Sequence, residues 1–269
     1  MIALMHKPVL ILAAAFLALC ALFAGRGYAQ DALPRESIEI GLSTNQVAIT
    51  SGFTGADLTI FGALDNANLQ VLRQGRYDII VVLEGPSRPI IVRRKSRIAG
   101  VWVNTQSVEF ENVPMSYSVA TTRLPQDITT TQGYQQLALG ADNIFLAPAN
   151  PDESKATVSQ FTDALRERKS AAGLYNERVG GVQFLSQNLF RASLAIPADV
   201  SVGTHRARAF LFRNGEFVTE TSEPLVIQKS GLEALIFETA REQSLLYGFL
   251  AVLLAIVTGW LGRVIFKRD

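Results

Sequence analysis

The densest group of chemically active side chains in this 269-residue chain is basic. Four of five consecutive residues carry a positive charge, and a tryptophan follows a few positions later; the set is Arg93, Arg94, Lys95, Arg97 and Trp102. Guanidinium forks and the lysine ammonium could hold a sulfate, a phosphate or the acidic surface of a partner. The same residues could instead be a solvated hairpin tip or a strand edge, where Lys and Arg prevent sheet-to-sheet aggregation. The sequence leaves both interpretations open, and these five residues are the candidate anion-binding or partner-binding set.

Residue types for catalysis or metal binding are scarce. The chain has two histidines, His6 and His205, and no ligand type stands beside His205 at the start of an expected strand, so we expect a structural histidine. The sequence has no phosphate-binding, dinucleotide-binding or serine-nucleophile motif and no calcium-loop spacing. We therefore expect no catalytic residue, no metal ligand, no cofactor and no enzyme activity. A Ser-His-Asp triad through His205 and a hydrolase built on a pair of carboxylates stay open as alternatives.

The first 29 residues have the parts of an export signal. Lys7 gives a positive start, an apolar run follows over residues 9–23, and Gly27 and Ala29 form a small-residue cleavage site. We expect cleavage after Ala29, which would remove Cys20, the single cysteine, and leave a mature chain without disulfides or Cys/His zinc sites. The alternatives are an uncleaved N-terminal helix and lipid attachment at Cys20.

A second apolar block, residues 245–266, is long enough to cross a hydrocarbon core of about 30 Å. It contains no Asp, Glu, Lys, Arg or His before Arg263, so it lacks the groups that mark ion or proton pathways. Arg263, Lys267 and Arg268 put positive charge on its C-terminal side, which predicts a single-pass inner-membrane protein with a periplasmic body and a cytoplasmic tail of residues 267–269. So short a tail leaves no room for a cytoplasmic catalytic domain. The near-neutral composition gives no reason to expect a nucleic-acid partner.

Small residues at spacings of three or four mark one side of this apolar block: Gly248, Ala251, Ala255 and Gly259. Such residues let a neighbouring membrane helix approach closely, so we expect a membrane-protein partner. The alternative is that Gly and Ala are simply common in membrane spans. Before the block, residues 230–244 are expected to form a juxtamembrane helix with an apolar stripe and an acidic remainder, serving either as a stalk packed on the body or as a docking helix.

The exported body is predicted to be mainly β. Runs rich in Val, Ile, Thr and aromatic residues alternate with turn residues, which indicates two immunoglobulin-like antiparallel β-sandwich domains, at residues 30–126 and 127–229. The expected strands are 38–42, 46–50, 57–61, 77–83, 89–94, 101–104, 107–110, 116–121, 143–146, 182–185, 189–196, 204–212, 216–220 and 225–228. The second domain carries a helical insertion at about residues 155–178, and Asn214-Gly215 predicts a type I′ hairpin turn.

Several runs resemble the alphaproteobacterial putative transmembrane protein family. They are residues 46–55, 92–104, 173–175, 180–185 and 210–215, with residues 246–248 and 259–261 of the anchor. The resemblance covers nearly the whole chain, including the helical insertion. It implies a signal-bearing, single-span membrane protein of Gram-negative bacteria, with sulfite-exporter-like permeases as neighbours, and it carries no assigned functional residues.

These observations favour a non-catalytic interaction or accessory subunit of a membrane complex, in which the partner is a transporter or another membrane protein. The alternative is a periplasmic sensor or binding module for a small anion at Arg93–Arg97, and an enzyme of unknown type comes third. A pocket lined by the basic residues would favour the anion module, whereas a flat apolar patch would favour the subunit.

Overall fold

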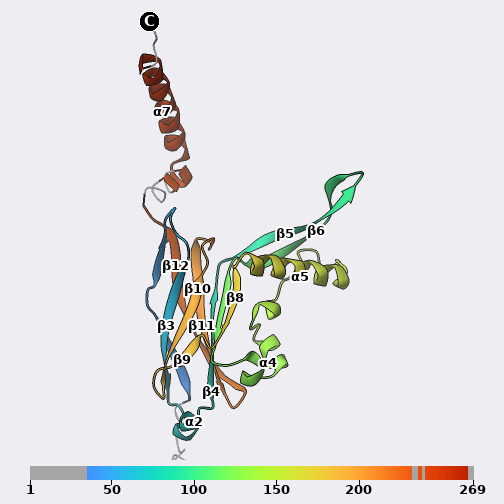
Figure 1. The fold of residues 1–269 in the computed structure, drawn as a ribbon, viewed down its shortest axis with the longest axis vertical. Helices are drawn as coiled ribbons and strands as arrows, with labels where there is room; N and C mark the ends of the chain where they lie inside the picture. Colours follow the sequence, from blue (N-terminus) through green and yellow to red (C-terminus); the bar gives the residue numbers. More distant parts are fainter. Residues whose placement is uncertain (1–34, 232–235, 238–239, 266–269) are drawn as a thin grey trace, which may run out of the picture. The chain divides into compact units, whose positions relative to one another are not determined.

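The computed structural model describes residues 35–231, 236–237 and 240–265, so the expected export signal and its cleavage site lie outside the described residues. The expected juxtamembrane helix at residues 230–244 is described only in part, with helix at 236–237 and 240–242. Within these ranges the fold is mainly β, with two sheets, a long separate hairpin, several short helices and one long helix near the C-terminus (Figure 1).

The body contains two sheets. The first has four strands in the order β1 (Ser37–Leu42), β3 (Ala56–Asp65), β10 (Leu189–Ile196) and β9 (Val182–Phe184). The second has six strands in the order β2 (Gln46–Ile49), β12 (Glu216–Lys229), β11 (Gly203–Arg213), β4 (Tyr77–Glu84), β7 (Tyr117–Thr121) and β8 (Tyr175–Val179). Neighbouring strands are antiparallel except β2 with β12 and β7 with β8, which are parallel.

Both sheets take strands from both halves of the chain, which corrects the expected division into two sandwiches near residue 126. β3 pairs with β10 in the first sheet, and β4 pairs with β11 in the second. The described residues from Glu36 onward belong to one unit, with no division near residue 126. The prediction was wrong because alternating residues reveal that a segment is a strand but do not reveal which distant strand supplies its hydrogen bonds.

Two apolar cores lie on opposite faces of the second sheet. β4 contributes to both, because Ile79 and Val81 belong to the core shared with the first sheet while Ile80 and Val82 belong to the other. A strand that is buried on both faces needs no polar side, which explains the apolar run from Ile79 to Leu83 in β4. The second sheet is therefore the central layer of the body.

Helices and the base of the hairpin cover the second core. The helical elements are α3 (Pro125–Ile128), α4 (Thr131–Gln136), the 3₁₀ turn η1 (Ala141–Asn143) and α5 (Lys155–Ala171); a further short helix, α2 (Leu69–Arg73), precedes β4. α5 begins after Ser154, whose hydroxyl accepts a hydrogen bond from the Thr157 amide, and it buries Phe161 and Leu165 in the core.

Two predictions in this region were wrong. The helix expected to reach residue 178 ends at Ala171, since Gly173 takes a φ of 68° and Tyr175 begins β8 beside β7. The expected strand at residues 143–146 is absent, because η1 takes up its first residue and the following residues lie outside the described strands. Ile144 and Leu146 are buried and Phe145 is exposed, so the alternation there reports burial without strand pairing.

Three expected strands merge into one long hairpin. β5 (Ser87–Ile98) and β6 (Val101–Pro114) pair with each other along their length, where separate strands at 89–94, 101–104 and 107–110 were expected. The turn at Asn214-Gly215 is confirmed, since it joins β11 to β12 with φ values of 51° and 89°, as a type I′ turn requires.

The long helix α7 (Ser244–Ile265) matches the expected membrane span. Its residues Ser244–Arg263 have a mean hydropathy of 2.1, long and apolar enough to cross a bilayer. Arg263 is its one basic residue in the last turn; Lys267 and Arg268 lie outside the described residues.

Candidate functional site

The base of the β5–β6 hairpin is anchored in the body. The Met115 amide donates a hydrogen bond of 3.1 Å to the Pro86 carbonyl, and the Gly85 amide donates one of 2.8 Å to the Ser116 carbonyl. Further along, Val108 and Phe110 of β6 are buried in the second core. These contacts hold the hairpin at its base and leave its far end, which we call the distal end and define as residues 95–104, exposed at every position except the partly buried Ser96.

The structure divides the basic cluster between the two faces of the hairpin. Arg94 points to the face covered by α5, where its guanidinium donates hydrogen bonds to Gln106, at 3.1 Å, and to Gln160, and lies 5.2 Å from the centre of the Phe161 ring. Figure 1 shows α5 running along this part of the hairpin. Arg94 therefore joins the hairpin to α5, and its side chain is not free for an external ligand.

The remaining candidates share the opposite face. Alternation along β5 puts Arg93, Lys95 and Arg97 on one side, and Trp102 is the cross-strand partner of Arg97. All four are exposed, Trp102 with 66% of its surface accessible. The Arg97 Nε donates to the Gly100 carbonyl at 3.4 Å, a long bond that leaves most of the guanidinium available. Four of the five predicted residues thus come together as a basic and aromatic surface.

The tip of the hairpin carries apolar side chains that the sequence reasoning missed. Ala99 and Gly100 form the turn with φ values of 49° and 87°, and Ile98 and Val101 flank it as a cross-strand pair. Val101 is 65% exposed, and Ile98 and Val103 are exposed as well. The signal in the sequence is a group of apolar residues beside the basic run, Ile98, Val101, Trp102 and Val103. Part of it, residues 101–104, was interpreted only as an ordinary strand.

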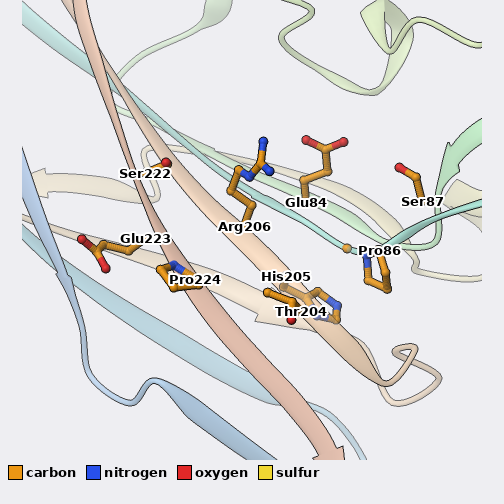
Figure 2. Close-up of a pocket in the computed structure, with 10 residues that line it drawn as sticks. Glu84, Pro86, Ser87, Thr204, His205, Arg206, Ser222, Glu223 and Pro224 are labelled. Carbon is orange, nitrogen blue, oxygen red and sulfur yellow. The ribbon is translucent and has the colours of Figure 1, made fainter.

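A pocket of about 430 Å³ lies near the base of the hairpin (Figure 2). It is formed by the end of β4, the start of β5, the start of β11 and the middle of β12. Glu84 and Arg206, which are cross-strand partners in β4 and β11, project to the same side of it. Its lining residues are Glu84, Gly85, Pro86, Ser87, Thr204, His205, Arg206, Ser222, Glu223 and Pro224. None of the basic hairpin residues takes part.

His205 has the partners of a structural histidine. Its Nδ1 lies 3.2 Å from the Gly203 carbonyl, which can only accept, so Nδ1 carries the proton and Nε2 accepts from the Ser116 hydroxyl at 3.3 Å. Complete burial lowers the pKa of His205, which favours this neutral form. Gly85 makes room for the pair, since a Cβ there would lie 2.5 Å from the Ser116 Oγ. The partner of Nδ1 is a carbonyl and not the carboxylate that a catalytic triad uses to orient its histidine.

Other buried polar groups join strands and loops. Asp78 of β4 is 2% exposed and accepts hydrogen bonds of 2.8 Å from Thr122 and from the Nε of Arg123. Lys169 of α5 donates to the Met115 carbonyl at 3.0 Å, and burial lowers the pKa of its ammonium group. Among the described residues, no group of three His, Cys, Asp or Glu side chains is placed to hold a metal ion.

The four small residues of α7 lie along one side of the helix, whose residues from Ser244 to Leu261 are exposed. A Cβ added at Gly248 or Gly259 would meet nothing within 4 Å. The window of the helix that could span a membrane has 0% of its residues buried by the described part of the chain. The row Gly248, Ala251, Ala255 and Gly259 is therefore open to a neighbour.

Residues 37–268 match the family described as "Putative transmembrane protein (Alph_Pro_TM)". The chain belongs to this family. The match confirms the resemblance drawn from the sequence, and with α7 it supports a membrane-anchored protein.

Two solved bacterial structures show a low level of likeness to this chain. The crystal structure of AggA, the major subunit of aggregative adherence fimbriae type I from Escherichia coli, has a TM-score of 0.25 and 9% identity, covering 73% of this chain and 97% of that chain. The N-terminal domain of the Streptococcus gordonii adhesin Sgo0707 has a TM-score of 0.23 and 9% identity, covering 72% of this chain and 33% of that chain. Likeness at this level says nothing of what this chain binds. None of the curated proteins matches it.

Proposed function

We propose that this protein is a non-catalytic accessory subunit that associates, through α7, with another membrane protein such as a transporter. The observation that carries the proposal is the open row of small residues on α7, Gly248, Ala251, Ala255 and Gly259, in a helix that the described chain does not cover. In lipid, no hydrophobic force drives helices together, so close backbone approach at such rows is a principal source of association.

The proposal includes export and orientation. Cleavage after Ala29 would leave an immunoglobulin-like body in the periplasm of an alphaproteobacterium, attached through α7, and the positive residues Arg263, Lys267 and Arg268 would hold the C-terminus in the cytoplasm. The anchor carries no acid or base before Arg263, so we assign transport or signalling chemistry to the partner and not to this chain.

A second candidate function is a periplasmic module that binds a small anion. It is favoured by the shared face of Arg93, Lys95, Arg97 and Trp102 on the hairpin. It is disfavoured because ligand sites for small molecules are concave, and the pocket described at the hairpin base is lined by other residues. The accessory-subunit proposal is therefore preferred.

The test replaces Ala255 and Gly259 with Leu, which keeps the helix apolar and blocks close approach. In mild detergent, native electrophoresis of the wild type should give a species larger than the monomer, and the A255L/G259L variant should migrate as a smaller species. The matched control adds bulk to the opposite side of the helix, as L253F/V257L, and should leave the larger species intact. A monomeric wild type, or equal behaviour of the two variants, would overturn the proposal.

A further inference from the structure

We infer that the distal end of the β5–β6 hairpin docks onto the anionic phospholipid surface of the membrane in which α7 anchors the chain. This inference goes beyond the accessory-subunit function, and it uses only the membrane anchoring. The ligand chemistry is a layer of phosphate-bearing headgroups above an apolar interior. The distal end offers basic, aromatic and aliphatic side chains in the order that such a layer requires.

That order runs along the hairpin away from its turn. The pair Ile98 and Val101 comes first, and Arg97 with Trp102 follows one residue further back, about 3.4 Å behind. Lys95 lies about 10 Å from the tip pair on the same scale. The headgroup layer of one leaflet is about 5–8 Å thick, so a shallow insertion places the aliphatic pair at the acyl boundary and the Arg97–Trp102 pair among the headgroups.

The charge of the outer part of the hairpin, beyond Glu109 and Glu111 near its base, is complementary to an anionic bilayer. Between Arg88 and Val108 the sequence has five basic residues and no acid. One of the five, Arg94, is engaged by α5, and Arg93, Lys95 and Arg97 stand exposed on one face. Basic clusters at a bilayer surface are attracted to anionic lipid, and the attraction weakens as salt screens it.

The apolar tip distinguishes this occupant from the alternatives. Protection of a strand edge would explain the Lys and Arg residues but not exposed Ile98 and Val101 at the turn. A free anion would explain the charges but would gain nothing from an aliphatic tip. An anionic bilayer uses both, and α7 keeps that bilayer at a high effective concentration for the rest of the chain.

The experiment uses tryptophan fluorescence of the full-length protein. The chain has two tryptophans, so Trp260→Phe leaves Trp102 as the single reporter. The protein is reconstituted in nanodiscs of phosphatidylcholine, with or without phosphatidylglycerol. We expect Trp102 emission to shift to shorter wavelength in the anionic discs and to be quenched there by lipids with brominated acyl chains. High salt should reverse most of the shift.

Two variants that each remove three positive charges test the basic face of the hairpin. R93Q/K95Q/R97Q should lose the shift and the quenching in anionic discs. R73Q/K155Q/R168Q removes three exposed basic charges from α2 and α5 and should retain both effects. I98S/V101S should lose quenching by the brominated chains, because the tip would no longer reach the acyl boundary.

Three results would overturn the inference. The first is identical Trp102 emission in neutral and anionic discs. The second is an equal shift on adding inorganic phosphate to neutral discs, which would assign the face to a free anion. The third is protection of Trp102 from solvent in native membrane vesicles but not in anionic discs, which would assign the face to a protein partner. None of these results bears on the α7 variants, so the accessory-subunit proposal stands or falls separately.

Discussion

His205 is completely buried at the start of β11, where burial favours the neutral imidazole and Nδ1 donates to the Gly203 carbonyl. Burial lowers its pKa in the folded state, whereas an unfolded chain takes up a proton near the ordinary value of about 6.5. The unfolded state therefore binds more protons below that pH. The stability that His205 contributes is fully present above about pH 6.5 and is lost as the pH falls towards its folded pKa.

This linkage predicts that the free energy of unfolding falls as the pH is lowered from 7 to 5, by urea denaturation in detergent. The H205Q variant should be less stable at neutral pH and should show a smaller slope over the same interval, because it removes the titrating group. The interpretation of His205 as a structural, neutral residue would be wrong if the variant and the wild type had the same slope.

Arg93 and Arg94 are adjacent in the sequence but face opposite sides of the hairpin, and this difference is measurable. Arg94→Gln removes the contact with the Phe161 ring and the bond to Gln160, and should cost about 0.5–1 kcal/mol of unfolding free energy. Arg93→Gln changes an exposed side chain and should stay within about 0.5 kcal/mol of the wild type. Equal losses from the two substitutions in chemical denaturation would contradict the division of the cluster.

At the scale of elements, the sequence predicted strands better than it predicted their partners. β10 and β11 were expected within about one residue of their bounds, because Leu189–Ile196 and the run up to Phe212 alternate clearly. The pairing of β4 with β11 could not be read, since a strand buried on both faces has no alternation to reveal its neighbours. The strand β8 was hidden because its short segment directly follows the helical pattern of α5.

The contact between β1, β3 and β10 depends on a glycine, which gives a matched pair of variants. A Cβ at Gly62 of β3 would lie 2.5 Å from the Glu39 carbonyl oxygen and would overlap the buried ring of Phe190. Gly62→Ala should therefore destabilise the protein by about 1–3 kcal/mol, the usual cost of overpacking. Gly41→Ala on the adjacent strand β1 meets nothing within 4 Å and should not destabilise it. Thermal unfolding of the two variants compares them, and similar losses would contradict the close packing at Gly62.

For the whole molecule, composition predicted a single C-terminal anchor, which α7 and the family match support, whereas export of the body stays a prediction. Apolar length alone located α7, because a span is recognised by local composition. The candidate site was harder to predict. The basic run was visible, but the separation of Arg94 from Arg93, Lys95 and Arg97 depends on α5 packing against one face of the hairpin, which is a contact between distant segments.

Orientation in the membrane is a prediction of its own. A phosphatase reporter that folds only in the periplasm should be active when inserted at the Asn214-Gly215 turn and inactive when fused after Asp269, because Arg263, Lys267 and Arg268 favour a cytoplasmic C-terminus. The opposite reporter pattern would reverse the topology.

The expected cleavage after Ala29 is a separate prediction. N-terminal sequencing of the same protein should begin at Gln30. A sequence beginning at Met1 or at a lipidated Cys20 would exclude the expected cleavage.

Photo-crosslinking within native membranes tests the central claim, that α7 holds this protein against another membrane protein, most directly. A photoreactive amino acid at position 255, on the small-residue side, should yield an adduct with a different membrane protein, which mass spectrometry can identify. The same group at position 253, on the opposite side, should yield little or none. Adducts only with a second copy of this chain, or equal yields at the two positions, would contradict the claim.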